Sequence, residues 1–232
     1  MNLFWTRPFQ KKQITSWNLT TYKDGLPFDF SSINLPYKLE IYSEHGDRIN
    51  TQDAEYPEQC IANMYIQEDD VVLELGARYG SVSCIINKRL SNKHNQVSVE
   101  PDSTVWSALE SNIQRNECSI QVFKGFVSKN TRSLVTQGYG ATSNIVEASS
   151  IQSKSVEEIE SMYQLKFNTL VADCEGFLED FFKEHPHLFD QLHTVIFEAD
   201  YPDKCNYDNI RSALKERGFV EILSGFQNVY KK

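Results

Sequence analysis

Apolar residues follow two alternating patterns between residues 55 and 232. Short apolar runs of strand length occur at 70–75, 96–100, 119–127, 168–172 and 193–197, with a closing pair at 220–223 and 227–230. Between them, apolar residues recur every three or four positions, near 55–67, 81–90, 103–113, 155–163, 178–184 and 206–216. The first pattern predicts strands and the second predicts helices. We therefore expect an α/β fold: a doubly wound, Rossmann-like sheet of seven mostly parallel strands with helices on both faces.

Two segments depart from this alternation. Residues 1–54 carry three of the chain's seven prolines and no sustained periodicity, so we expect a partly irregular N-terminal extension with one strand near 38–42. Residues 128–152 are polar and rich in Ser, Thr and Gly, which predicts a long loop or hairpin inserted into the domain. The predicted ligand-binding domain then spans residues 55–232 and includes this insertion.

Composition narrows the function classes. Hydrophobic residues make up 40% and charged residues 24% of the 232 positions, as in ordinary globular domains. No apolar run approaches the roughly 18 residues that span a membrane, and the N-terminal stretch has no secretory apolar core. Five scattered cysteines without a C-x-x-C pair favour free thiols in a reducing, cytoplasmic compartment. A net charge of −9 without a basic stripe weighs against nucleic acid and fits a neutral or cationic small substrate, or a glycan.

The segment VVLELGARYGS combines a predicted strand, an acid, two glycines and a helix start. Gly76 and Gly80 would let the backbone turn sharply and approach a ligand closely. The helix that begins at Ser81 would point its N-terminal amides toward an anionic group. Glu74 can accept from a cationic amino group, and Glu100, at the end of the next strand, is placed to bind ribose hydroxyls. This order of features predicts a nucleotide-like cofactor at the carboxyl end of the sheet.

The glycine pattern bears on which cofactor binds. A dinucleotide site needs G-x-G-x-x-G, and here the third position is Arg78, whose side chain would obstruct a pyrophosphate. The form acid-x-Gly-x-x-x-Gly instead resembles motif I of class I S-adenosylmethionine-dependent methyltransferases, with VSVEPD as the acidic second motif. An NAD(P)-dependent oxidoreductase and a non-catalytic cofactor-binding module remain the alternatives. The predicted cofactor-binding residues are Glu74, Gly76, Ala77, Arg78, Tyr79, Gly80, Ser81, Glu100, Pro101, Gly125, Phe126 and Asp173.

Three later segments extend the resemblance. LVADCEGFLEDFF, VIFEADYP and IRSALKERGF with its trailing strands resemble the FkbM-type methyltransferase family over roughly residues 55–232. That family typically has Asp-x-Glu-Gly after the fourth strand and a Glu at the end of the fifth, which match Asp173 to Gly176 and Glu198 here. The resemblance implies the class I methyltransferase fold and O-methylation, often of sugar hydroxyls on glycans or glycosylated natural products. This chain departs from the family at Tyr79, where Asn is usual, and its insertion lies where acceptor specificity would be set.

Acids follow the fourth and fifth predicted strands, at one edge of the sheet. Asp173 and Glu175 come after the fourth strand, and Glu198 and Asp200 after the fifth. Methyl transfer to a hydroxyl needs a proton acceptor, so Asp173 (the first choice), Glu198 and Asp200 are candidate catalytic residues. The same three acids could hold a divalent metal such as Mg²⁺ or Mn²⁺. In the alternative, Glu175 caps a helix and Asp200 caps a turn, without metal. Tyr139, in the insertion, could stack on a sugar face.

Overall fold

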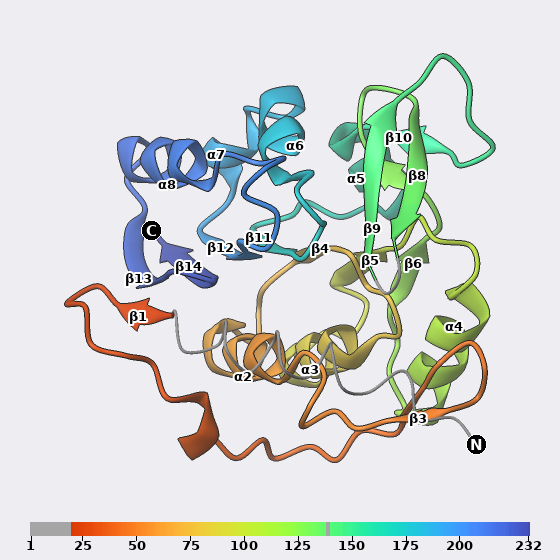
Figure 1. The fold of residues 1–232 in the computed structure, drawn as a ribbon, viewed down its shortest axis with the longest axis horizontal. Helices are drawn as coiled ribbons and strands as arrows, with labels where there is room; N and C mark the ends of the chain where they lie inside the picture. Colours follow the sequence, from red (N-terminus) through yellow and green to blue (C-terminus); the bar gives the residue numbers. More distant parts are fainter. Residues whose placement is uncertain (1–19, 138–139) are drawn as a thin grey trace.

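The computed structural model describes residues 20–137 and 140–232 and contains one large sheet (Figure 1). Across the sheet the strands are β1 (Thr21–Tyr22), β13 (Val220–Ser224), β14 (Gln227–Lys231), β12 (Thr194–Glu198), β11 (Thr169–Ala172), β4 (Val72–Leu75), β5 (Gln96–Val99) and β6 (Gln121–Phe123). Strands β12, β11, β4, β5 and β6 run parallel, and β14 lies antiparallel to both of its neighbours. The predicted Rossmann-like, mostly parallel sheet is confirmed, and β1 adds an eighth strand to the seven expected.

The strand order reverses between β4 and β11. From β4 the chain proceeds to β5 and then β6 on one side, and it returns later to place β11 and β12 on the other side. In open α/β sheets, ligands bind outside the carboxyl ends of the strands at such a reversal. The carboxyl ends of β4, β5 and β11 are therefore the expected place for a ligand.

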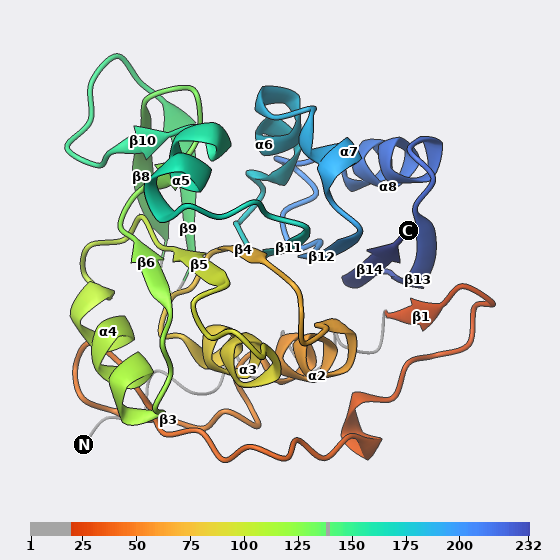
Figure 2. The ribbon, with the colours of Figure 1, turned by 180° about the vertical axis from the view of Figure 1, so that it is seen from behind.

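Helices cover both faces of the sheet (Figures 1 and 2). One face carries α2 (Tyr56–Tyr65), α3 (Ser81–Arg89) and α4 (Trp106–Arg115). The other face carries α5 (Val156–Tyr163), α6 (Leu178–Glu184), α7 (Leu188–Gln191) and α8 (Tyr207–Glu216). Side chains of β4 alternate between the two cores, because Val72 packs with α2 and α3 whereas Leu73 and Leu75 pack with the helices opposite. Each predicted helix is present, and α7 is an addition.

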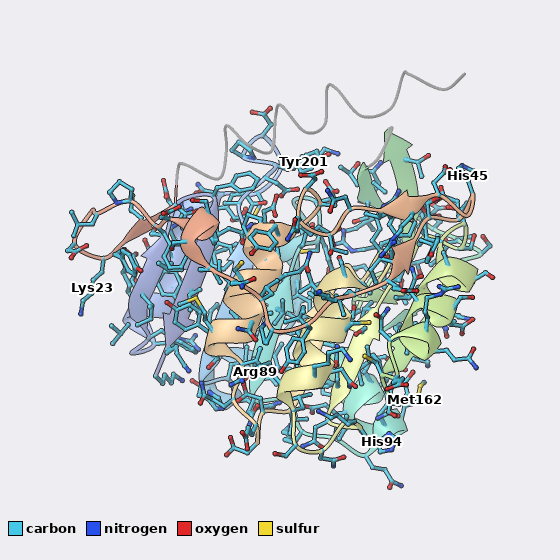
Figure 3. The ribbon with its side chains drawn as sticks, turned by 90° about the horizontal axis from the view of Figure 1, so that it is seen from below. Lys23, His45, Arg89, His94, Met162 and Tyr201 are labelled. Atoms are coloured by element: carbon cyan, nitrogen blue, oxygen red, sulfur yellow. The ribbon has the colours of Figure 1, made fainter. Side chains whose placement is uncertain are left out.

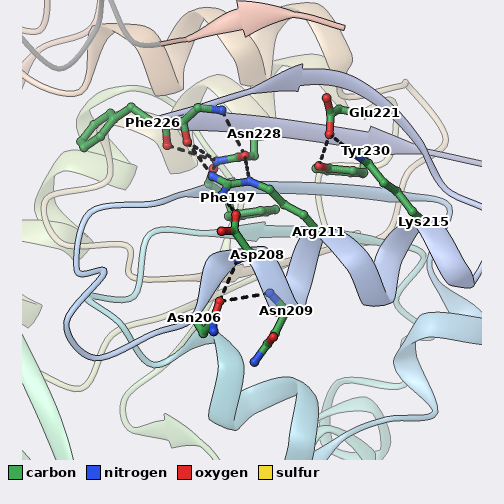
Figure 4. A network of polar contacts seen from close by, with 11 residues as sticks. Phe197, Asn206, Asp208, Asn209, Arg211, Lys215, Glu221, Phe226, Asn228 and Tyr230 are labelled. Atoms are coloured by element: carbon green, nitrogen blue, oxygen red, sulfur yellow. Dashed lines mark hydrogen bonds and ion pairs between the residues drawn. The ribbon is translucent and has the colours of Figure 1, made fainter.

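Local sequence signals set the helix ends. Ser155 and Glu158 form a reciprocal capping box at the start of α5. The side chain of Asn206 accepts two backbone amides at the start of α8. Arg211 of α8 donates to Asn228 at 3.0 Å and to the carbonyl of Gly225 at 2.9 Å, which fixes the helix to the β13–β14 pair (Figure 4).

Residues 20–54, the described part of the N-terminal extension, lie along the face that α2 and α3 cover (Figure 3). It contains β1, a 3₁₀ turn η1 (Phe30–Ser32) and a short hairpin of β2 (Ile41–Tyr42) and β3 (Arg48–Ile49). The strand expected near 38–42 is confirmed as β2. Asn112 and Asn116 of α4 exchange hydrogen bonds with the backbone of Tyr42 and Glu40, so side chains of the domain satisfy the polar backbone of the extension.

The insertion forms a separate hairpin of β8 (Arg132–Gln137) and β9 (Gly140–Ile145), flanked by the pair β7 (Phe126–Val127) and β10 (Ser153–Lys154). The single strand expected at 119–127 is therefore split into β6 and β7. The split falls at Gly125, where a Cβ would lie 2.5 Å from the carbonyl oxygen of Gln152, so only glycine fits.

Arg132 fastens the hairpin to the domain. Its side chain is 2% exposed and donates to Asp180 at 3.0 Å and to Glu184 at 2.9 Å, both on α6. The guanidinium carbon also lies 4.1 Å from the ring centre of Phe177. Because β8 and β9 pair only with each other, this buried cation supplies a principal tie between the hairpin and α6.

Two further expectations concern the whole chain. The five cysteines are free thiols, as expected. Within residues 20–137 and 140–232, none of the helices combines the length and apolar character that crossing a bilayer requires. Tyr139 and most of the first half of the extension lie outside the described residues.

Candidate active site

A pocket of about 740 Å³, open solvent included, lies at the carboxyl ends of β4, β5 and β11. Seven of the twelve predicted cofactor residues line it: Gly76, Arg78, Glu100, Pro101, Gly125, Phe126 and Asp173. The structure thus brings together residues from four separate segments at the reversal of strand order.

Gly76 makes the closest approach in the site. Its φ is +87°, and a Cβ there would lie 1.7 Å from the backbone oxygen of Asp173. The contact is held by hydrogen bonds from the amide of Gly76 to Val99 and from the amide of Asp173 to Leu75, both at 3.0 Å. The first glycine therefore serves two purposes, since it turns the chain after β4 and admits the end of β11 beside it.

Glu100 closes the glycine loop from the end of β5. Its two carboxylate oxygens accept the backbone amides of Arg78 and Asp102, each at 2.7 Å. Burial raises the pKa of Glu100 to about 7, against the lowering effect of these two hydrogen bonds. Arg78 adopts a φ of +42°, and its guanidinium lies 3.6 Å from the Asp102 carboxylate. Each oxygen of Glu100 keeps capacity for a further donor, such as a ribose hydroxyl.

Four of the predicted cofactor residues shape the loop and do not line this pocket. Ala77 is buried, and its amide donates to Val99 at 3.0 Å. The hydroxyl of Tyr79 donates to Glu44 of the extension at 2.5 Å. At Gly80, a Cβ would lie 2.9 Å from Leu109, and the Ser81 hydroxyl donates to Glu55. A direct contact of these residues with a cofactor stays a prediction.

Glu74 lies beneath the loop and inside the protein. Its carboxylate accepts the hydroxyl of Ser98 and is 2% exposed. Burial raises its pKa to about 7, and hydrogen bonds from Ser98 and Gln96 oppose this rise. It lines a smaller cavity next to the pocket, so its predicted contact with a cationic amino group stays a prediction.

Three acids gather at the other end of the pocket. Ligand atoms of Asp173, Glu175 and Asp200 lie within 4.8 Å of one another. Burial raises the pKa of Asp173 well above its usual range, and the carboxylates of Asp200 and Glu175 raise it further. Burial and the neighbouring Glu175 also raise the pKa of Asp200 to about 8, although the Tyr207 hydroxyl donates to it at 2.9 Å. Crowded acids of this kind can hold a proton at neutral pH and exchange it with a substrate.

Glu198 stands apart from this group. It is the last residue of β12, and its carboxylate accepts from the side chain of Gln227 at 2.9 Å. Among the described residues, Glu175 takes the place beside Asp173 and Asp200 that the sequence assigned to Glu198. A metal at either set of acids stays a prediction.

Several pocket residues were not predicted from the sequence. They are Glu55, Leu75, Val99, Asp102, Val127, Leu134, Ala141, Ser143, Cys174, Glu175 and Phe177. Leu134, Ala141 and Ser143 belong to β8 and β9, so the insertion forms one wall of the pocket. The β-branched Val135 and Thr136, followed by the glycines at 138 and 140, were the available signal for this hairpin, but nothing local indicated where it would pack.

Comparison with known proteins gives matches in structure alone. No protein-family model matches the chain, and no curated protein matches it. A precorrin-6y C5,15-methyltransferase from Geobacter metallireducens is similar with a TM-score of 0.47 at 12% identity, over 78% of this chain and 88% of the other. An O-methyltransferase from Bacillus cereus in complex with SAH has a TM-score of 0.44 at 12% identity, over 79% and 82%. A protein of the NADB-Rossmann superfamily from Streptococcus agalactiae has a TM-score of 0.49 at 9% identity, over 75% and 67%. The function proposed below therefore rests on the residues of this chain.

Proposed function

We propose that this chain is an S-adenosylmethionine-dependent O-methyltransferase that acts on a hydroxyl of a carbohydrate or glycoconjugate. The observation that carries the proposal is the joining of the glycine loop, Glu100 and Asp173 around one pocket at the reversal of strand order. The carbohydrate acceptor is supported by the resemblance of the Asp173 to Gly176 segment and its surroundings to FkbM-type methyltransferases.

The pocket suits the parts of the cofactor. Glu100 can accept the ribose hydroxyls, and Phe126 and Val99 offer apolar surface for a base. Arg78 lines the same pocket in the position where a dinucleotide site needs a small residue. When bound, S-adenosylmethionine supplies an electrophilic methyl group on a sulfonium centre.

The acids at the end of β11 then act on the acceptor. The acceptor oxygen must approach within about 3 Å of the methyl carbon, in line with the bond that breaks. Asp173 would accept the proton of the acceptor hydroxyl, and the neighbouring carboxylates of Asp200 and Glu175 would keep its pKa high enough to hold that proton. Glu198 lies on the neighbouring strand end and borders the same region through the smaller cavity.

The cofactor assignment is tested by isothermal titration calorimetry with S-adenosylmethionine, S-adenosylhomocysteine and NADPH. We expect binding of the first two, and a Glu100→Gln variant should bind S-adenosylhomocysteine roughly tenfold more weakly because one charged acceptor is lost. The exposed Glu216→Gln serves as the matched control and should bind like the wild type. Binding of NADPH alone would contradict the proposal.

The reaction is tested by S-adenosylhomocysteine release across a panel of mono- and oligosaccharides. With an active acceptor, Asp173→Asn should lower turnover by roughly 100-fold or more and leave cofactor affinity nearly unchanged. The exposed Asp69→Asn is the control for removal of an acid. Turnover measured with EDTA and then with added Mg²⁺ or Mn²⁺ tests the metal separately, because a metal-assisted reaction stops with EDTA and recovers with either ion.

A further inference from the structure

A second, smaller cavity, of about 390 Å³ with open solvent included, lies next to the cofactor pocket. It shares Glu55, Leu75, Gly76 and Asp173 with the larger pocket, so the two are contiguous. Five of its lining residues are acids: Glu55, Glu58, Glu74, Asp173 and Glu198. No Lys, Arg or His occurs among the described residues that line it. We call this space the acidic cavity.

Strand alternation explains why these acids meet. Val171 of β11 and Ile196 of β12 both pack on the α2 side of the sheet and lie opposite each other in the register. Because successive side chains alternate, Asp173 and Glu198, two residues further along each strand, face the same side. The first turn of α2 brings Glu58 to this side as well. Three acids from three elements therefore enclose one space.

One carboxyl oxygen of Glu58 receives no hydrogen bond from an amide, hydroxyl or cationic donor in the described part of the chain, and its neighbour across the cavity is the Glu198 carboxyl. The residue is 7% exposed, and its Oε1 accepts the side-chain amide of Gln227. Its Oε2 is buried and is the oxygen without such a donor among the described residues. Gln227 also donates to Glu198, so a single neutral amide serves two carboxylates. A buried acceptor without a donor lowers the stability of the folded chain unless a ligand supplies the donor.

The buried carboxyls need positive charge, which either a proton shared between Glu58 and Glu198 or a bound cation can supply. A buried carboxylate is strongly disfavoured without a positive charge or several donors, and the acidic cavity provides one amide, from Gln227, for Glu58 and Glu198 together. The amino-acid end of S-adenosylmethionine fits poorly here, because its own carboxylate would lie among five acids. The group that suits the cavity is positively charged and carries no anion beside it.

An ammonium group suits the cavity better than a metal ion does. Within the described residues, the acids whose ligand atoms converge within 4.8 Å are Asp173, Glu175 and Asp200, and only Asp173 of these lines the acidic cavity. The cavity acids therefore do not form a compact ligand set of the kind that Mg²⁺ requires. A primary ammonium donates three hydrogen bonds in separate directions, which matches acids spread around a space.

We infer that the acidic cavity binds a primary ammonium group of the methyl acceptor, so that the acceptor is an amine-bearing hydroxyl compound of the amino-sugar type. The assignment to the acceptor rests on the proposed methyltransferase function. The orphan oxygen of Glu58 and the shared wall at Asp173 carry the inference, because Asp173 would then lie between the bound amine and the transferred methyl group.

The test is calorimetric titration of 1,4-diaminobutane into the full chain saturated with S-adenosylhomocysteine, in buffer with roughly physiological salt to screen surface charges. The uncharged 1,4-butanediol is the matched ligand control. We expect the diamine to bind and the diol not to bind. Glu58→Gln should weaken diamine binding roughly tenfold or more, whereas the exposed Glu216→Gln should leave it unchanged. Glu198→Gln is the second variant if Glu58→Gln does not fold.

Three results would overturn the inference. Equal binding of diamine and diol, or diamine binding that neither cavity variant weakens, would remove the cavity as a cation site. Mutual exclusion of diamine and S-adenosylhomocysteine would assign the cavity to the cofactor's own amino group. If Mg²⁺ binds more tightly than the diamine and Glu58→Gln abolishes that binding, the acidic cavity is a metal site. If S-adenosylhomocysteine itself does not bind, the proposed function fails, and the same diamine titration in its absence still decides the cation site.

Discussion

Replacement of Gly76 by alanine tests the central contact of the site. A Cβ at this position would lie 1.7 Å from the backbone oxygen of Asp173 and 2.9 Å from its carbonyl carbon. Both atoms belong to the backbone at the end of β11, so no side-chain rotation relieves the overlap. The loop after β4 or the end of β11 must move, and both carry proposed site residues.

The expected cost has two parts. A non-glycine residue at φ +87° costs roughly 1–2 kcal/mol in backbone strain. Forcing an extra carbon into a packed position costs about 1–3 kcal/mol more. The sum of about 2–5 kcal/mol lowers the melting temperature by roughly 2–4 °C per kcal/mol for a chain of this size. We therefore expect a loss of about 4–20 °C.

Gly218 provides a matched control within the same chain. Its φ is +84°, and a Cβ there would meet nothing within 4 Å. Gly218→Ala thus introduces the same kind of backbone strain and the same change in unfolded-chain entropy as Gly76→Ala, but no steric overlap with neighbouring atoms. The difference between the two variants isolates the contact between Gly76 and Asp173.

The assay is thermal unfolding by calorimetry together with titration of S-adenosylhomocysteine. Gly76→Ala should melt below Gly218→Ala by several degrees and should bind the ligand at least tenfold more weakly, whereas Gly218→Ala should bind normally. Equal melting temperatures for the two variants would refute the close approach of β4 and β11 at this point.

Two further predictions concern buried charge. Arg132→Met should lower the melting temperature by roughly 6–12 °C, because about 3 kcal/mol is lost when the guanidinium leaves Glu184 without its ion pair. Arg217→Met, which breaks an exposed pair, should change stability by less than about 1 kcal/mol, and an equal loss in both variants would contradict the role of Arg132. The pKa of Glu74 is about 7 in the folded chain and lower when unfolded, so the unfolded state loses its proton first and stability falls as pH rises toward 7. Urea unfolding at pH 5 and at pH 7 measures this fall in the free energy of unfolding. The fall should be smaller by about 1–3 kcal/mol in Glu74→Gln than in the wild type, and an equal fall in both would contradict the raised pKa of Glu74.

Much of the fold could be predicted from local pattern. Helices α2, α3, α5 and α8 follow apolar residues at helical spacing, and Ser155 and Asn206 mark two of their starts through capping hydrogen bonds. The strands could be predicted from short apolar runs, because central parallel strands bury both faces. The addition of β1 to the sheet could not be predicted, since this two-residue strand joins the sheet through β13, some 200 residues along the chain.

The candidate site was predictable in part. The glycine loop, Glu100 and Asp173 follow strand ends whose positions the pattern indicates, and all line the pocket. The nearness of Asp173, Glu175 and Asp200 follows from their strand ends, whereas the backbone turn that brings Glu175 beside Asp173, with a φ of +52°, could not be predicted. Glu198 shares the acidic cavity with Asp173, and its place on the α2 side follows from strand alternation and from the contact with Gln227.

The sequence by itself determined the order of helices and strands, the turn after β4 and the acids at the strand ends, because each depends on residues close together in the chain. Only the tertiary structure decided which acids share a space. Packing of α2 against the sheet places Glu58 in the same cavity as Glu198, although 140 positions separate them. The ion pair of Arg132 with α6 holds the β8–β9 hairpin in place as a wall of the larger pocket. Such neighbours are selected by the burial and pairing of whole elements, which no local pattern of residues specifies.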